Sequence, residues 1–296
     1  MPKFAIYTAI VGNYDEIRQP LVVDSRFDYF LFSNTIQEKQ VGVWQIKPIE
    51  YINPDQIKIA RYVKTHPETL LPDYAATLWM DANIQIADNW VYERFVELYN
   101  QGAQIASVKH PERDCVYEEM FTVCSTKWES IETAWRWNYY LRKNRYPMYN
   151  GLFETNILYR VNSVAIQKVD EEWWICIEQY SRRDQLSFNF VLWHSRKECS
   201  YFLKEDECAL RSPHFELILH PDQTSKIVKE KGYINYLWEY YWKLPSSQKK
   251  SFYKKWLGII SKPYWMSMGE FYLWRQMIRL MRDWQRYYDK ISSCKQ

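Results

Sequence analysis

The chain has 296 residues, of which 47% are hydrophobic and 25% charged, and this globular mixture excludes a disordered chain. Its 7 glycines are too few for glycine-rich phosphate loops, and neither the dinucleotide-binding pattern nor the P-loop pattern occurs. After residue 245 there are 11 Lys or Arg against 3 Asp or Glu, whereas the rest of the chain is net acidic, so we expect no nucleic-acid partner.

The first half of the chain alternates between strand and helix patterns. Apolar runs predict strands at 4–11, 27–33, 41–49, 76–81 and 104–110. One helix is predicted to begin at Asn53-Pro54, and a second is predicted to begin after a cap at Asn89. This alternation predicts an α/β fold, with a mainly parallel, Rossmann-like sheet flanked by helices.

The middle of the chain is more helical. The pattern predicts a long helix over 126–145, a strand over 152–161 and a helix over 182–194. Between the last two, Asn162 or Ser163 is expected to cap a helix that ends near residue 180. We therefore expect the α/β domain to occupy residues 1–225.

A basic and aromatic extension follows over residues 226–296. Its pattern predicts helices at about 233–243, 247–260 and 268–291. Basic residues attract anionic lipid head groups, and Trp and Tyr settle at membrane interfaces. The extension is thus expected either to attach to the inner face of the plasma membrane, or to pack on the core or form a dimer contact.

Cysteine spacing and hydropathy indicate the compartment. The six cysteines form neither a C-x-x-C pair nor a zinc-binding spacing, which favours reduced thiols. The first apolar run is short and lacks a cleavage site, and no run is long enough to span a bilayer. We expect a cytoplasmic protein.

Asp81 and Asn83 follow the apolar strand over 76–81. Open α/β sheets bind ligands beyond the carboxyl ends of their strands. Two oxygen ligands two residues apart can face one Mg²⁺ or Mn²⁺ ion, which would neutralise a diphosphate leaving group. The alternative is a turn in which both side chains hydrogen-bond their own backbone.

Six segments in order resemble one domain family, which includes plant turgor-regulation and mucilage-related proteins and many bacterial proteins regarded as GT-A-type glycosyltransferases. The segments are YTAIVGNYD (7–15), FDYFLFSN (27–34), ARYVKTHPETLLPDYAATLWMDANIQI (60–86), SVKHPERDCVYEE (107–119), GLFETNILYRVNS (151–163) and RRDQLSFNFVLW (182–193). The resemblance implies a GT-A-like fold and sugar transfer from a nucleotide sugar. It does not cover the chain after about residue 220.

The resemblance also implies a donor site. It places the nucleotide at the first strand and its loop, on Tyr7, Thr8, Ala9 and Asp15. It aligns Asp81 and Asn83 with the Asp-x-Asp metal motif, with a neutral residue at the second position. Some GT-A enzymes add a late histidine, for which His214 and His220 are the candidates, although both are expected to be surface or second-layer histidines.

Arg61 and Lys64 lie three residues apart and so share one helix face. They are expected either to contact the donor phosphates or to form a solvated basic face.

Further candidates lie at a strand end, on a strand and at a helix start. His110, Arg113 and Glu118 or Glu119 follow a strand and are expected to bind substrate, or else to form an acidic first turn of a helix. Glu154 and Asn156 share one face of their strand, where both are expected to belong to the site and Asn156 to bind substrate. The resemblance places Asp184 and Gln185 at the acceptor or donor.

Two carboxylates are candidates for the chemistry. In an inverting reaction, Asp184 or Glu154 would take the proton from the hydroxyl group of the acceptor. In a retaining reaction, either residue would stabilise the sugar in the transition state. The resemblance favours Asp184.

We therefore expect a glycosyltransferase that uses a nucleotide sugar, UDP-linked in preference to GDP-linked. Its acceptor would be a glycan or a lipid-linked glycan, in bacterial capsule, O-antigen or similar surface polysaccharide synthesis. A metal-dependent amide hydrolase acting on a lipid and a non-catalytic glycan-binding module are the alternatives.

Overall fold

The computed structural model describes residues 2–12, 14–125 and 128–218, and the single residues 248, 275 and 278. The chain divides into two compact units, Met1–Glu119 with Tyr140–Thr224 and Met120–Tyr139 with Ser225–Gln296. The predicted domain boundary after residue 225 and the helices expected beyond it lie outside the described residues, and they stay predictions. The elements that carry the candidate site belong to the first unit.

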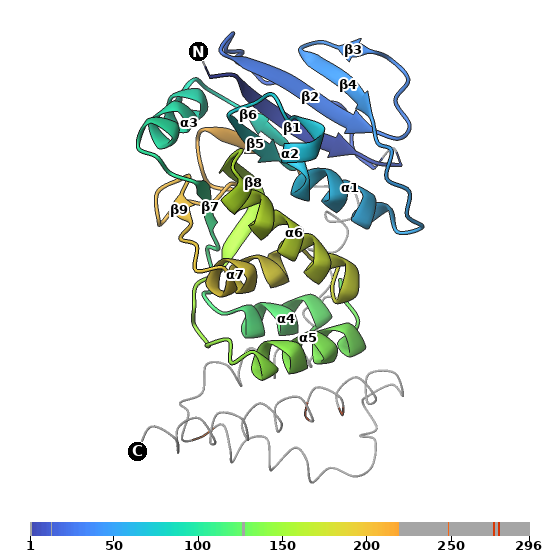
Figure 1. The fold of residues 1–296 in the computed structure, drawn as a ribbon, viewed down its shortest axis with the longest axis vertical. Helices are drawn as coiled ribbons and strands as arrows, with labels where there is room; N and C mark the ends of the chain where they lie inside the picture. Colours follow the sequence, from blue (N-terminus) through green and yellow to red (C-terminus); the bar gives the residue numbers. More distant parts are fainter. Residues whose placement is uncertain are drawn as a thin grey trace. The chain divides into compact units, whose positions relative to one another are not determined.

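The first unit is built on an eight-stranded sheet with the order β3-β4-β2-β1-β5-β8-β7-β9 (Figure 1). Its strands are β1 (Phe4–Ile10), β2 (Phe27–Ser33), β3 (Gln40–Val41), β4 (Trp44–Pro48), β5 (Ala76–Met80), β7 (Ile105–Lys109), β8 (Phe153–Val161) and β9 (Ser200–Tyr201). β1 pairs in parallel with β2 and β5, whereas β8 runs antiparallel to β5 and β7. A second sheet pairs β6 (Ile84–Ile86) with β10 (Phe215–Leu217). The predicted α/β class, with a mostly parallel sheet, is confirmed.

Seven helices belong to the described residues. They are α1 (Gln56–Thr65), α2 (Pro67–Leu70), α3 (Trp90–Asn100), α4 (Val116–Ser125), α5 (Ile131–Lys143), α6 (Val164–Gln179) and α7 (Gln185–His194). The helix predicted over 126–145 is present in shortened form as α5, and α4 is a separate helix that ends before that range. Asp55, rather than Asn53, caps α1, and its side chain accepts a hydrogen bond from the Ile57 N–H. Ser163 caps α6 as predicted.

Side chains alternate along β1 and so divide the sheet into two faces. Phe4 and Ile6 belong to a hydrophobic core that also holds Phe95 of α3. Tyr7 points to the opposite face, where its hydroxyl donates to the backbone carbonyl of Lys64 in α1 at 2.9 Å. Helix α1 packs on α6, and α6 packs on α7 (Figure 1). Helix α3 therefore covers one face, and α1 and its neighbours cover the other.

The buried side chain of Arg160 in β8 links α1 and α6 to the sheet through hydrogen bonds. Its guanidinium is buried and donates to Asp170 Oδ1 at 2.6 Å and to the carbonyl of Lys64 at 2.5 Å. A further hydrogen bond joins it to the hydroxyl of Tyr7. A buried charge is stable only when it is paired and hydrogen-bonded. These bonds therefore fix the carboxyl-terminal turn of α1, which carries Lys64.

The structure also addresses the expectations about membrane-spanning segments and about the cysteines. None of the helices within the described ranges is long and apolar enough to cross a membrane. Cys115, Cys176, Cys199 and Cys208 carry free thiols. The membrane contact predicted for the extension lies outside the described residues.

Replacing Arg160 by Met should lower the free energy of unfolding by about 3–5 kcal/mol, because Asp170 loses its buried partner. Replacing both residues, with Arg160→Met and Asp170→Leu, should recover part of that loss, since no unpaired charge remains. Urea unfolding of the single and double variants measures both effects. A double variant as unstable as the single one would contradict the assigned role of the ion pair.

Candidate functional site

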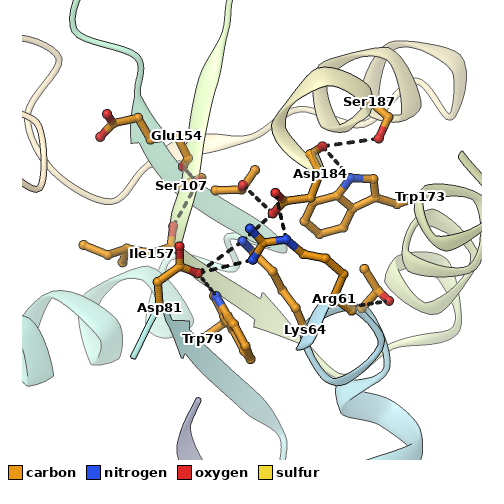
Figure 2. A network of polar contacts seen from close by, with 12 residues as sticks. Arg61, Lys64, Trp79, Asp81, Ser107, Glu154, Ile157, Trp173, Asp184 and Ser187 are labelled. Atoms are coloured by element: carbon orange, nitrogen blue, oxygen red, sulfur yellow. Dashed lines mark hydrogen bonds and ion pairs between the residues drawn. The ribbon is translucent and has the colours of Figure 1, made fainter. Parts of the chain in front are cut away.

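Two carboxylates and two cations meet where β5 ends and α7 begins (Figure 2). Lys64 Nζ lies 2.5 Å from Asp184 Oδ2 and 3.5 Å from Asp81 Oδ1. Arg61 Nε lies 3.1 Å from Asp184 Oδ1, and its Nη1 lies 3.8 Å from Asp81 Oδ1. The shared helix face predicted for Arg61 and Lys64 thus points at both carboxylates. We call these four residues the ion-pair cluster.

Neutral groups fix the carboxylates of the ion-pair cluster in place. Asp81 Oδ1 accepts a hydrogen bond from Trp79 Nε1 at 2.8 Å, and Asp184 Oδ2 accepts one from Thr155 Oγ1 at 2.7 Å. Trp173 Nε1 donates to the backbone carbonyl of Asp184 at 3.0 Å. Lys64 Nζ lies over the rings of both tryptophans, at 5.5 and 5.9 Å from their centroids. The cluster is therefore rigidly held.

The environment keeps Asp184 ionised. Burial by itself would raise its pKa, but Arg61 and Lys64, with the hydrogen bonds from Lys64 and Thr155, hold the pKa well below its usual range. Burial also lowers the pKa of Lys64, against the opposing effect of the carboxylates. A carboxylate whose pKa is strongly lowered is a weak proton acceptor. Asp184 is thus suited to position cations rather than to accept a proton.

Glu154 has the opposite environment. Burial, with smaller contributions from the carboxylates of Glu119 and Asp81, raises its pKa to about 7 against the lowering effect of hydrogen bonds with Asn156 and the Ala209 backbone. Its Oε2 is buried and has no hydrogen-bond partner in the described chain. Figure 2 shows the side chain directed away from Asp184. The pKa of this carboxyl group therefore lies near neutral pH, where the group can gain or lose a proton.

Asn156 shares that side of β8, as the alternation predicts. Its Oδ1 is likewise buried without a partner among the described residues. Its backbone carbonyl accepts a hydrogen bond from the Asp81 N–H at 2.9 Å. Asn156 therefore lies directly beside the end of β5.

The segment after β7 holds a second group of predicted substrate-binding residues. Arg113 Nε donates to Glu119 Oε2 at 2.6 Å, and the Arg113 N–H donates to His110 Nδ1 at 3.0 Å. Burial, with Arg113 beside it, lowers the pKa of His110 to about 4, so the ring is neutral at pH 7. Of the two adjacent glutamates, Glu119 is the buried partner of Arg113, whereas Glu118 interacts with the Tyr149 hydroxyl.

The residues predicted to hold the nucleotide lie on β1 and in the loop after it. Tyr7 and Ala9 are buried within the strand, and the hydroxyl of Tyr7 is already bonded to α1. Thr8 Oγ1 is buried and has no hydrogen-bond partner among the described residues. Asp15 is partly exposed in the loop, and Gln185 is partly exposed at the first position of α7. Their binding roles stay predictions.

The three predicted metal ligands do not all assemble around one point. Asn83 Nδ2 donates to the carbonyl of Ile218 at 3.0 Å, and His214 Nδ1 lies 2.8 Å from Asp88 Oδ2. Asn83 and His214 are at opposite ends of the β6–β10 sheet, about 13 Å apart at the rise of a β-strand. Within residues 2–12, 14–125 and 128–218, no three His, Cys, Asp or Glu side chains form a group that could hold a metal.

The predicted ligand set of Asp81, Asn83 and His214 thus does not fit one ion. Mg²⁺ is often held by one or two carboxylates together with substrate phosphates, so Asp81 with a bound donor, with or without Asn83 Oδ1, is the arrangement that remains. His220 lies outside the described residues. The requirement for a divalent cation stays a prediction.

The neutral partners in the site carry little signal in the sequence. Thr155 follows Glu154 in the strand, and Trp173 lies in the middle of α6. Neither residue stands in a recognisable pattern, because only the packing of α6 and α7 against β8 brings them to Asp184. Trp79 precedes Asp81 by two residues, and that spacing on a strand places both side chains on one face.

Comparison with known proteins identifies a family and solved structures with a similar fold. The model of the TOD1/MUCI70 glycosyltransferase-like domain matches residues 1–212. No curated protein matches the chain. The apo structure of WbbM, a bifunctional glycosyltransferase, is similar with a TM-score of 0.40 and 12% identity over 68% of this chain. This chain covers 38% of the WbbM chain.

Replacing Asp184 by Asn should lower the free energy of unfolding by about 3–5 kcal/mol at pH 7, because two buried cations lose a carboxylate. The pKa of Asp184 is lower in the folded than in the unfolded chain, where it is about 3.9. Its stabilisation is therefore present above about pH 4 and is lost as the pH falls further.

Urea unfolding between pH 3 and pH 8 measures this dependence, with the exposed Asp206→Asn as the matched control. A variant that differs from the parent equally at every pH would contradict the ionised state assigned to Asp184.

Proposed function

Since this chain belongs to the TOD1/MUCI70 family of glycosyltransferase-like domains, we propose that it transfers a sugar from a nucleoside diphosphate donor to a glycan or lipid-linked glycan. The observation that carries the proposal is the ion-pair cluster at the carboxyl end of β5. Ligands of open α/β sheets bind at this edge. Within this proposal, UDP is the favoured nucleotide of the donor, and bacterial surface polysaccharide synthesis is the setting.

The charges around Asp81 suit a diphosphate. Arg61, Lys64 and Arg183 all interact with the Asp81 carboxylate, and Arg113 lies with Glu119 after β7. The side chain of Lys64 is only 1% exposed, whereas that of Arg61 is 16% exposed. Arg61 is therefore the cation that contacts the donor, and Lys64 holds the two carboxylates. A guanidinium can bind phosphate oxygens through two parallel hydrogen bonds.

A divalent cation, when bound with the donor at Asp81, would neutralise the leaving diphosphate. The chain itself orients that carboxylate through Trp79 and Lys64. Because His214 is paired with Asp88, the donor phosphates and water would supply most of the coordination.

Glu154 is the better candidate for the proton acceptor in an inverting reaction. A general base works best when its pKa lies near the working pH. The pKa of Glu154 is raised to about 7, and its Oε2 is free of protein partners in the described chain. Asp184 is held ionised by two cations, and we assign it to positioning Arg61 and Lys64.

Thermal unfolding with UDP, GDP, CDP and ADP tests the donor class, each with Mn²⁺ or with EDTA. A ligand at ~100 times its dissociation constant adds about 2.7 kcal/mol to the stability of the folded state. We expect one nucleotide to stabilise the chain with Mn²⁺, and we expect Asp81→Ala to lose that effect. The exposed Asp206→Asn should retain it.

Stabilisation by the same nucleotide in EDTA would show binding without a metal. No stabilisation by any of the four would contradict the transferase proposal and would favour the glycan-binding module.

Replacing Glu154 by Gln should lower kcat by about 10²–10⁴-fold, because the variant has no proton acceptor, while nucleotide binding persists. The wild-type kcat/KM should fall below pH 7 as Glu154 becomes protonated. Initial rates between pH 5 and pH 9 measure both effects. Unchanged turnover in the variant would remove Glu154 from the chemistry.

The same variant should also differ from the parent in the pH dependence of its free energy of unfolding. The pKa of Glu154 is higher in the folded chain, about 7, than in the unfolded chain, so wild-type stability falls as the pH rises from about 4 to 7. Glu154→Gln should therefore be more stable than the parent by up to about 3 kcal/mol at pH 8 and equal to it at pH 4. The exposed Glu216→Gln is the control.

A further inference from the structure

A cavity of about 750 Å³ lies between the carboxyl-terminal half of α7 and the start of β8. Its wall includes Asn150, Phe153, Asn189, Trp193, Arg196 and Lys197. None of these residues belongs to the ion-pair cluster. Pockets for small molecules span about 300–1,000 Å³ and combine apolar walls with a few placed polar groups.

Asn189 supplies a hydrogen-bond donor to the cavity. The side chain is 4% exposed, and its Oδ1 accepts a hydrogen bond from the Phe153 N–H at 3.0 Å. Its Nδ2 has no hydrogen-bond partner in the described part of the chain, although the residue lines the cavity. An unpaired donor at the wall of a cavity can be satisfied by a ligand or by water.

Two aromatic side chains form fixed walls. The ring of Trp193 meets Tyr146 edge to face, with centroids 5.3 Å apart. The ring of Phe153 meets Phe188 in the same manner at 6.1 Å. Such pairs hold the rings in place and leave their other surfaces to a ligand. The apolar C–H face of a pyranose matches such a surface.

Arg196 stands at a backbone position that favours glycine. Its φ is +54°, and it follows the end of α7, where the Lys197 N–H donates to the Leu192 carbonyl at 2.8 Å. The side chain is exposed and forms no hydrogen bond or ion pair with the described residues. Strained backbone positions of this kind concentrate at functional sites. Arg196 lines the cavity, and its guanidinium has no partner among the described residues.

The charges at the cavity are mostly positive. Arg196 is joined by Lys197, whose Nζ also donates to Gln104 Oε1 at 3.1 Å, and Glu198 is the opposing charge. His194 Nδ1 is paired with Glu172 Oε1 at 2.6 Å. A guanidinium recognises a carboxylate through two parallel hydrogen bonds.

We propose that this cavity binds a carboxylate-bearing sugar. Trp193 and Phe153 stack on the ring, Asn189 donates to a hydroxyl, and Arg196 pairs with the carboxylate. The assignment of that sugar to the acceptor glycan rests on the proposed function, whereas its binding does not. Phe153 precedes Glu154 in β8, so the cavity adjoins the strand that carries the proposed proton acceptor.

NMR titration without nucleotide tests the proposal, with a disaccharide that ends in glucuronic acid and the same disaccharide ending in glucose. We expect the acidic disaccharide to bind the wild-type chain more tightly than the neutral one. Arg196→Gly should weaken acidic binding by ~10-fold or more, as the loss of a charge-assisted hydrogen bond implies. Asn189→Asp keeps the acceptor for the Phe153 N–H but adds a negative charge, so it should also weaken that binding.

Arg145→Gly is the matched control, because Arg145 is exposed, has a φ of +58° and does not line the cavity. Both glycine variants remove left-handed strain and should raise the Tm, so a loss of binding by Arg196→Gly is not unfolding.

Equal binding of the two disaccharides, equal affinity of the two glycine variants, or no binding of the acidic disaccharide would overturn the proposal. Glycan binding without any nucleotide effect would count against the proposed function alone. A nucleotide effect without glycan binding would count against the cavity alone.

Discussion

The contact between Lys64 and Asp184 is the interaction on which the rest of the site depends. Both side chains are almost fully buried, and burial of either charge alone would be costly. The pair is stable because Arg61, Asp81 and Thr155 complete its charges and hydrogen bonds. The contact also requires the carboxyl-terminal turn of α1 to occupy a fixed position on the sheet. Arg160 holds that position, because its guanidinium donates to the backbone carbonyl of Lys64.

Two carboxylates in one site acquire different properties from their surroundings. Asp184 faces two cations and stays ionised, whereas Glu154 is buried near other carboxylates and has a pKa of about 7. Environments that separate the pKa values of two acids commonly separate their roles. Here they distinguish a group that positions cations from a group that can exchange a proton.

The antiparallel direction of β8 brings these groups together. Because β8 runs against β5, its first residues lie at the edge where β5 ends. The pairing with β7 is irregular, with Ser107 opposite Leu158 and Val108 opposite Glu154. Ser107 Oγ donates to the carbonyl of Glu154 at 2.6 Å and so stabilises the irregularity. Thr155 Oγ1 then donates to Asp184 Oδ2. Figure 2 shows that the side chain of Glu154 points away from Asp184.

The sequence by itself determined the alternation of strands and helices, the place of Asp81 at a strand end, and the family, because these follow from local hydrophobic patterns and ordered motifs. It also placed Arg61 and Lys64 on one helix face. It did not give the bounds of α4 and α5, since an aromatic-rich pattern does not mark where a helix begins or ends. Only the tertiary structure decided which charges pair, because Lys64 and Asp184 are 120 residues apart. It also decided the pKa values of Asp184 and Glu154 and the separation of Asn83 from His214, since burial and strand pairing depend on contacts between distant segments.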